Sequence, residues 1–402
     1  NGLSGIGSVK TEAQNPFGET EAQLAIIEND HTDENPSISD LRAFKQESLL
    51  KIIAAASLSA DDSATQLQLA ATSPLDQPAP LEALLHGAIP ARFVDQTCAA
   101  PILALVRQAN CAQLAEEIYG QRVLVIPAAS SLSEQARSIA NLIQSSDLES
   151  IEGIIVEGIG LFAFHDEAEQ SYKRSLQLTE QAQSFFEAQS NSSDSTSSGE
   201  SASLIEFAEL RQAVSMKLAQ AQVGHLDDSP AAINLSNNEH ANTVLGASSA
   251  ITQGDHQANL GSATDLQQVA WAKRGLFSFG INKTETATRA TKASRASQAN
   301  QLAGADASWS PALPESSNTS TPPLTLQGKI ALVSGSAAGI GLATATTLAE
   351  AGVCVIGADI NPEIMDIMAG IGALGITINL TDEPKVKAMI EQIIQTYGGL
   401  DI

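Results

Sequence analysis

Three glycines near the C-terminal end of the chain, Gly335, Gly339 and Gly341, have a spacing that suits a phosphate-bearing ligand. They follow the apolar run at residues 330–333 and precede a helical pattern. A strand that passes through a tight glycine turn into a helix points the N–H groups of the helix N-terminus at a pyrophosphate. Gly335 would supply the sharp exit from the strand, Gly339 the close backbone approach and Gly341 the close helix packing. The pattern predicts a dinucleotide-binding turn.

An acidic residue and two hydroxyls stand where such a ligand needs them. Asp359 ends the second apolar run, residues 353–358, at the place where a carboxylate accepts hydrogen bonds from the ribose hydroxyls of NAD. The same charge repels the 2′-phosphate of NADP, so NAD is the expected cofactor and NADP is disfavoured. Ser334 and Ser336 offer hydroxyls to a phosphate or a ribose. The alternative role of Asp359 is that of a turn or N-cap residue before Asn361.

The turn also resembles that of a known family. With Ser334 before it and Ile340 between its last two glycines, it reads S-G-x3-G-I-G, which is similar to the turn of the short-chain dehydrogenase/reductase family. The resemblance covers residues 324–402 and implies the first half of a Rossmann doubly wound parallel sheet. In that family an Asp and an apolar residue flank the adenine, and Asn379 and Leu380 stand at those positions here. The expected cofactor-binding residues are Ser334, Gly335, Ser336, Gly339, Ile340, Gly341, Asp359, Asn379 and Leu380.

The family's catalytic groups, a Ser and a Tyr-x-x-x-Lys motif, have no match in the 402 residues. Tyr397 and Lys385 do not sit in that pattern. We therefore predict no catalytic residue, and we expect the chain as written to be an inactive fragment of an oxidoreductase.

The N-terminal region alternates strands and helices, which predicts an α/β layer structure. Short strands are expected at residues 122–126 and 151–156, and helices at 133–143 and 167–188. The order of these blocks resembles the class II aldolase fold, and in particular the bifunctional rhamnulose-1-phosphate aldolase/short-chain dehydrogenase family. The residues that carry this resemblance are Leu84-Leu-His86, Arg92-Phe-Val-Asp95, Arg122-Val-Leu-Val, Ile151-Glu-Gly and Gly160-Leu-Phe.

The residues that would bind a metal in that family are changed here. The family's three metal-binding histidines correspond to Gln96, Cys98 and Ile159, and an amide, a thiol and an alkyl group cannot replace three imidazoles. Glu82 matches the family's general acid/base, but without the metal it has no acidified substrate proton to remove. The resemblance therefore implies an inactive domain, with no metal. A different metal site built from His86, Cys98 and His165 is the alternative.

The middle of the chain, residues 191–323, is expected to be a low-complexity linker. Residues 191–200 are hydrophilic and have nothing to bury, and a helical segment is expected near 204–235. The paired Pro322 and Pro323 mark the start of the last domain. The predicted organisation is an aldolase-like domain at 1–190, the linker at 191–323 and the dehydrogenase segment at 324–402.

The composition excludes several classes of partner. Asp and Glu number 46 against 21 Lys and Arg, so the formal charge is -25, which disfavours nucleic acid and anionic membranes. The three cysteines, Cys98, Cys111 and Cys354, contain no C-x-x-C pair, and a reducing compartment suits them. With no apolar run of about 18 residues and no signal sequence, a cytoplasmic location is expected.

Together these observations favour an NAD-dependent oxidoreductase that acts on a sugar-derived or other small alcohol, or on the matching carbonyl compound, and that forms a homo-oligomer. The alternative is that the aldolase-like half is a non-catalytic scaffold used for oligomerisation or for binding a sugar.

Overall fold

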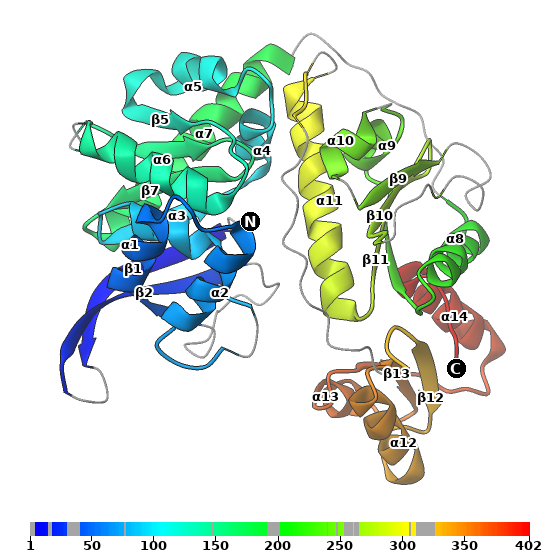
Figure 1. Cartoon of the computed structure of the whole chain (residues 1–402). Helices are drawn as coiled ribbons and strands as arrows, with labels where there is room; N and C mark the ends of the chain where they lie inside the picture. Colours follow the sequence, from blue (N-terminus) through cyan, green and yellow to red (C-terminus); the bar gives the residue numbers. More distant parts are fainter. Residues whose placement is uncertain are drawn as a thin grey trace. The chain divides into compact units, whose positions relative to one another are not determined.

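The structure of the protein is a computed structural model. It describes residues 5–14, 18–29, 41–75, 78–146, 148, 150–190, 202–238, 240–246, 248–252, 260, 265–304, 307–310 and 326–402. The chain divides into two compact units (Figure 1). The first unit is Asn1–Ser193 with Leu302–Leu313, and the second is Asp194–Gln301 with Pro314–Ile402.

The first unit is built on a seven-stranded sheet with the order β3-β2-β1-β4-β7-β6-β5. Neighbouring strands are antiparallel except for β5 and β6, which are parallel. The strands are β1 (Gly5–Gln14), β2 (Thr20–Asn29), β3 (Arg42–Lys45), β4 (Phe93–Thr97), β5 (Val123–Ile126), β6 (Gly153–Val156) and β7 (Gly160–His165).

Helices cover both faces of this sheet. On one face the strand residues Val94, Phe162 and Phe164 pack with α1 (Gln46–Ala54), α2 (Ala60–Ala70), α3 (Glu82–Ala88) and α6 (Leu132–Gln144). Because side chains alternate along a strand, Leu161 and Ala163 point to the other face. There α7 (Ala168–Ser190) lies against β4 and β7, with α4 (Ala100–Val106) and α5 (Cys111–Tyr119) packed on it.

The second unit contains a four-stranded sheet with the order β8-β11-β10-β9. Its strands are β8 (Val223–Asp227), β9 (Ser249–Thr252), β10 (Gln268–Trp271) and β11 (Gly275–Gly280). Its helices are α8 (Leu204–Lys217), α9 (Pro230–Ser236), α10 (Ala241–Leu245) and α11 (Lys283–Ala303). The core of this part is formed by Phe207 and Leu210 of α8 with Val269, Phe277 and Phe279 of the sheet.

This sheet lies where the sequence led us to expect a linker, and the helical segment expected near 204–235 contains strand β8 between α8 and α9. The physical reason is that α11 buries small residues, Ala290, Ala293, Ala296 and Ala299, so its packed face does not stand out as an apolar stripe. The strands of four to six residues are also too short to show a clear period. The boundaries expected at 190 and 323 adjoin or lie in residues outside those described.

A three-stranded parallel sheet forms the C-terminal part of the second unit, with the order β12-β13-β14. Its elements are β12 (Ile330–Ser334), α12 (Gly339–Glu350), β13 (Cys354–Asp359), α13 (Ile364–Ala369), β14 (Leu374–Thr377) and α14 (Glu383–Tyr397).

Helices lie on both faces of this sheet as well. Met389 and Ile393 of α14 pack against Ile330 and Ile356 on one face. On the other face, Ala331 and Val355 pack with Ala345 of α12 and with Ile364 and Met368 of α13. The end of the chain pairs with the outer edge of β12, because the N–H of Asp401 donates to the carbonyl of Ile330 at 2.9 Å and the N–H of Leu332 donates to that of Ile402 at 2.9 Å. The α/β fold class predicted from the sequence is confirmed, with the opening strands of a doubly wound sheet at the C-terminus.

A buried ion pair ties the two parts of the second unit together. Arg211 of α8 contacts Asp401 at 2.5 Å, and the two side chains are 7% and 20% exposed. The same carboxylate accepts from the N–H of Ile330 at 2.8 Å. Asp401 thus links α8 to the start of β12.

Candidate functional site

The backbone of the turn between β12 and α12 takes a path that requires its glycines. Gly335 and Gly339 adopt positive φ angles of +64° and +57°, a region that residues with a Cβ rarely occupy. Gly341 lies in the first turn of α12, and a Cβ there would overlap the carbonyl oxygen of Gly335. The N–H of Gly335 donates to the carbonyl of Ala358 at 2.8 Å, which anchors the turn to β13.

Asp359 holds the other side of the turn. Its carboxylate accepts from the N–H of Asn361 at 2.9 Å and from the N–H of Ala337 at 3.0 Å. These two backbone hydrogen bonds, that of Asn361 first, hold the pKa of the Asp359 carboxyl below its ordinary value. Asp359 therefore carries its charge at neutral pH, beside the turn and at the end of β13.

Ser336 differs from its expected role. We expected its hydroxyl to face a phosphate or a ribose, but the side chain is fully buried. Its Oγ lies against the backbone of Gly357 and has no hydrogen-bond partner among the described residues. The reason is the turn itself, which directs this side chain back over β13 toward Met368. Only the backbone of Ser336 remains for a ligand, whereas Ser334 is exposed.

The remaining predicted residues lie at the carboxyl ends of the same strands. Asn379 and Leu380 follow β14, and the N–H of Ile378 donates to the carbonyl of Asp359 at 2.7 Å, which places them beside β13. The side-chain oxygen of Asn379 accepts from the N–H and the hydroxyl of Thr381. Ligands of open parallel sheets bind at this edge. The structure brings together there Ser334, Gly335, Gly339, Ile340, Asp359, Asn379 and Leu380.

Three large apolar side chains are exposed at this edge, and sequence reasoning had named Ile340 and Leu380 but not Ile360. Ile340 is 89% exposed and Ile360 is 70% exposed, and Leu380 is also exposed. The three follow β12, β13 and β14 respectively, so they lie along one edge of the sheet. Large apolar side chains exposed together indicate a surface that a ligand or a partner covers. Ile360 comes directly after Asp359 at the end of the second apolar run, and that position was the signal available in the sequence.

In the N-terminal unit, Gln96, which stands where the resembled family has a metal-binding histidine, belongs to a hydrogen-bond network with His86 and Ser8. His86 is fully buried, and its Nε2 lies 3.1 Å from Oε1 of Gln96 while its Nδ1 lies 2.8 Å from the hydroxyl of Ser8. Because an amide oxygen only accepts, Nε2 carries the proton and Nδ1 accepts from Ser8. Burial lowers the pKa of His86 to about 3, so the imidazole is neutral.

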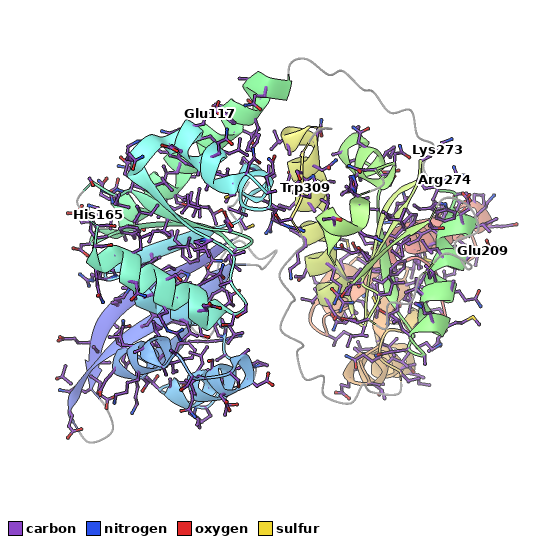
Figure 2. All side chains as sticks on the ribbon, turned by 45° about the horizontal axis from the view of Figure 1, so that its top comes forward. Glu117, His165, Glu209, Lys273, Arg274 and Trp309 are labelled. Carbon is purple, nitrogen blue, oxygen red and sulfur yellow. The ribbon has the colours of Figure 1, made fainter. Side chains whose placement is uncertain are left out.

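The alternative metal site is not assembled. In the β4–β7 pair Phe93 lies opposite His165, while Thr97 lies opposite Leu161. Cys98 follows Thr97, so it lies at the other end of the pair from His165, about 17 Å away at the usual rise of a strand. His165, labelled in Figure 2, instead accepts at Nδ1 from the N–H of Glu167 at 2.9 Å. Within the part of the chain that the structure describes, no three His, Cys, Asp or Glu side chains could hold one ion.

Comparisons with known proteins match the C-terminal segment to one family and find solved structures similar to the chain. The family model described as short chain dehydrogenase matches residues 329–402. The chain is 36% identical over 83 residues to the 3-oxoacyl-[acyl-carrier-protein] reductase FabG of Thermotoga maritima, a match that covers 19% of this chain and 34% of that protein. It is 37% identical over 82 residues to the (-)-isopiperitenol/(-)-carveol dehydrogenase of Mentha piperita, covering 19% and 31%. The chain thus spans about a third of the length of these curated relatives.

Among solved structures, the N-terminal class II aldolase domain of a conserved protein from Thermoplasma acidophilum is similar at a TM-score of 0.40. It is 21% identical, and the match covers 45% of this chain and 83% of that one. The l-fuculose-1-phosphate aldolase from Thermus thermophilus is similar at a TM-score of 0.28, with 16% identity over 46% of this chain and 84% of that one. The expected resemblance of residues 324–402 to short-chain dehydrogenases is confirmed by the family model, and the class II aldolase likeness expected before it is found again among these structures. No helix among the described residues is both long and apolar enough to cross a membrane.

Proposed function

From the short-chain dehydrogenase character of residues 329–402, we propose that this segment binds NAD at the carboxyl ends of β12, β13 and β14, and that the protein is an NAD-dependent oxidoreductase. The observation that carries the proposal is the link between Asp359 and the glycine turn. A carboxylate fixed by the N–H groups of Ala337 and Asn361 stands beside a turn whose Gly335 and Gly339 have positive φ. That combination suits a ribose next to a pyrophosphate.

Different residues of this edge would contact different parts of NAD. The backbone of the turn from Gly335 to Gly341 would hold the pyrophosphate at the N-terminus of α12. The Asp359 carboxylate would accept from the ribose hydroxyls, and the side chains of Asn379 and Leu380 would lie against the adenine. The bound nicotinamide supplies a hydride acceptor or donor, which is the chemistry of this class of enzyme.

The preference for NAD over NADP rests on charge. Asp359 is ionised at neutral pH because its two backbone hydrogen bonds lower the pKa of its carboxyl. A phosphate on the 2′-oxygen would place a second negative charge next to this carboxylate. Two like charges about 4 Å apart repel by roughly 1 kcal/mol in bulk water and roughly 4 kcal/mol near a protein surface. Discrimination between the two cofactors by about 10-fold or more follows if the repulsion exceeds ~1.4 kcal/mol.

The substrate we propose is a sugar-derived or other small alcohol, or the corresponding carbonyl compound. The support is the sequence resemblance to a family that joins an aldolase-like domain to a dehydrogenase. We propose further that the protein is cytoplasmic and forms a homo-oligomer. Its three widely spaced cysteines, which contain no C-x-x-C pair, suit a reducing compartment.

We propose that the aldolase-like unit has no aldolase activity and serves as a scaffold. The supporting observation concerns Gln96, which stands at one of the family's metal-binding positions. It carries an amide in place of an imidazole, and this amide is hydrogen-bonded to His86. Metal analysis of the purified chain tests this: about one equivalent of zinc or manganese per chain would refute it, and less than a tenth of an equivalent is expected. Mass measurement of the intact chain tests the scaffold role, since a monomer at micromolar concentration would count against oligomerisation.

The oxidoreductase proposal is tested by the fluorescence of NADH. Bound to the full chain, the reduced nicotinamide cofactor should show a saturable change in emission that excess NAD reverses. The Asp359→Ala variant should need a clearly higher NADH concentration for half-saturation. An emission that rises linearly with NADH and does not respond to NAD would refute cofactor binding.

A further inference from the structure

Two segments of the chain, one in each unit, share a strand order. In the first unit four strands follow the order β4-β7-β6-β5, and in the second unit four follow β8-β11-β10-β9. In each set the first two neighbouring pairs are antiparallel and the third pair is parallel. Two helices join the first strand of each set to its last, α4 and α5 in one and α9 and α10 in the other. A long helix follows each set, α7 and α11.

The agreement extends to the register of the pairs. In the first set Gly153 lies opposite Ala163 and Val156 lies opposite Gly160. In the second set Gln268 lies opposite Ser278 and Trp271 lies opposite Gly275. When the same number is added to every residue number of the first set of pairs, the result is the second set of pairs. The shared sequence Gly-Leu-Phe-x-Phe, at residues 160–164 and 275–279, follows the same shift.

Local details follow this shift as well. The turn before β7 contains Gly158 with φ +80°, and the turn before β11 contains Lys273 with φ +66°, a rare conformation for a residue with a side chain. Arg174 donates to the carbonyl of Phe164 at 2.8 Å, and Arg289 donates to the carbonyl of Phe279 at 2.5 Å. The two segments agree in strand register, in the positive φ of the turn residue and in a side-chain hydrogen bond. We infer from this agreement that the second segment is a copy of the first.

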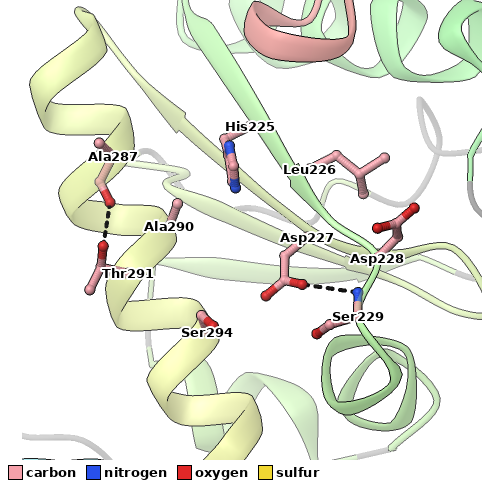
Figure 3. Close-up of a pocket in the computed structure, with 9 residues that line it drawn as sticks. All are labelled: His225, Leu226, Asp227, Asp228, Ser229, Ala287, Ala290, Thr291 and Ser294. Carbon is pink, nitrogen blue, oxygen red and sulfur yellow. Dashed lines mark hydrogen bonds between the residues drawn. The ribbon is translucent and has the colours of Figure 1, made fainter. Parts of the chain in front are cut away.

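The two copies differ at the helix that follows. In the first copy α4 packs against α7. In the second copy a pocket of about 480 Å³ lies between α11 and the junction of β8 with α9 (Figure 3). The constant shift aligns Tyr172 with Ala287 and Leu176 with Thr291, so two large side chains of α7 correspond to small ones in α11. The residues beside the pocket therefore differ between the two copies.

The chemistry of the pocket favours hydroxyl groups. His225 and Asp227 alternate with Leu226 on β8 and point toward α11 (Figure 3). Asp227 accepts from the N–H of Ser229 at 3.0 Å, which fixes its carboxylate. Partial desolvation between β8 and α11 lowers the pKa of His225 below its ordinary value, and a neutral imidazole ring both donates and accepts. The lining residues are His225, Leu226, Asp227, Asp228, Ser229, Ala287, Ala290, Thr291 and Ser294.

The same lining excludes other ligands. It contains no Lys or Arg, and Asp227 and Asp228 would repel a phosphate or a carboxylate. No three ligating side chains among the described residues converge for a metal ion. The volume falls in the range of pockets that hold small molecules, roughly 300–1,000 Å³. Ala287 and Ala290 offer apolar surface to the C–H groups of a ring or chain.

We propose that this pocket, in the second copy of the half-sheet, binds a neutral polyhydroxylated small molecule, a free monosaccharide or the corresponding alditol. The Asp227 and Asp228 carboxylates accept from neighbouring hydroxyls of the ligand, and His225, Ser229 and Ser294 complete its hydrogen bonds. The site is separate from the cofactor edge and does not depend on NAD binding.

The test is a calorimetric titration of the full chain with glucose, mannose, mannitol and xylitol, and with glucose 6-phosphate for comparison. At least one neutral compound should bind saturably at one site per chain, without NAD present. Its dissociation constant should rise about 10-fold in Asp227→Asn, which keeps the acceptor for Ser229 but loses the charge. It should rise at least as much in Ala290→Leu, which fills the pocket.

The matched control is Tyr172→Ala in the first copy, at the position that corresponds to Ala287, and binding should be unchanged there. Thermal unfolding of each variant shows whether it is folded. The proposal is overturned if none of the four neutral compounds binds to the folded wild-type chain, if glucose 6-phosphate binds more tightly than all of them, or if Asp227→Asn and Ala290→Leu bind as the wild type does. The chain can bind the neutral compound even if it does not bind NAD, and it can bind NAD even if it does not bind the neutral compound.

Discussion

The carboxylate of Asp359 lies 3.0 Å from the backbone nitrogen of Ala337 and accepts its hydrogen bond. This contact joins the end of β13 to the middle of the glycine turn, so the residue that would read the ribose also shapes the loop that would hold the phosphates. A change at Asp359 should therefore alter cofactor choice and turn order together, and the two effects can be separated by the choice of substitution.

The substitution Asp359→Asn keeps an oxygen that can accept from Ala337 and removes the charge. The dissociation constant for NAD should rise about 10-fold, since a hydrogen bond to a charged group contributes roughly 1.5–3 kcal/mol. The constant for NADP should fall, because the repulsion of its 2′-phosphate is gone. Parallel calorimetric titrations of NAD and NADP measure both changes. Equal losses for the two cofactors would show that the charge of Asp359 plays no part in discrimination.

Gly341→Ala places a methyl group on the carbonyl oxygen of Gly335, so the turn and the first turn of α12 have to separate. The free energy of unfolding of the C-terminal segment should fall by about 1–3 kcal/mol, as in other overpacked sites, and NAD binding should be lost. The control is Gly370→Ala, where φ is -61° and the neighbouring atoms are farther away. Urea unfolding followed by circular dichroism makes the comparison. A Gly341→Ala chain as stable as the Gly370→Ala chain would contradict the packing described.

His86 predicts how the stability of the first unit depends on pH. Burial lowers its pKa from 6.5 to about 3, so the unfolded chain binds a proton at pH 5 that the folded chain does not. Stability is therefore fully present above pH 6.5 and is lost as the pH falls from 6.5 toward 3, with a slope of up to about 1.4 kcal/mol per pH unit.

Urea unfolding at pH 7, 6, 5 and 4 measures this slope, and the His86→Leu variant supplies the comparison. The variant should be less stable at pH 7, because Ser8 and Gln96 lose their partner, but its stability should depend less on pH between 6.5 and 4. Identical slopes in the two proteins would show that His86 is not the group responsible.

Arg211→Met breaks the buried ion pair and leaves the Asp401 carboxylate with poorer compensation. Removing one partner of a buried pair costs about 3–5 kcal/mol, so the second unit should unfold at lower urea concentration. Lys387→Met is the matched control, because Lys387 and its partner Glu391 are exposed and such pairs contribute about 0–1 kcal/mol. If both variants unfold with the wild type, the contact between α8 and the end of the chain carries no stability.

The glycine turn could be predicted from the sequence because every part of it is local. Gly335, Gly339 and Gly341 are close in the chain, and the strand and helix on either side have clear apolar patterns. Asp359 was also placed correctly at the end of the second strand. The orientation of Ser336 could not be read, since it depends on the path of the backbone after Gly335 and on the space left by Gly357.

The middle sheet and the network around His86 were not predictable for different reasons. The packed face of α11 consists of Ala and Ser, which resemble the composition of a linker. Ser8 and His86 are distant in sequence and meet only because β1 pairs with β4. The likeness between the two half-sheets was hidden because it resides in register and turn geometry more than in residue identity.

The central claim is that the turn from Gly335 to Gly341 binds NAD, and calorimetric titration of NAD into the full chain tests it most directly. We predict saturable binding of one NAD per chain, weaker binding of NADP, and loss of the signal in Gly341→Ala while Gly370→Ala behaves as the wild type. No heat of binding from a folded wild-type chain at millimolar NAD, or tighter binding of NADP than of NAD, would contradict it.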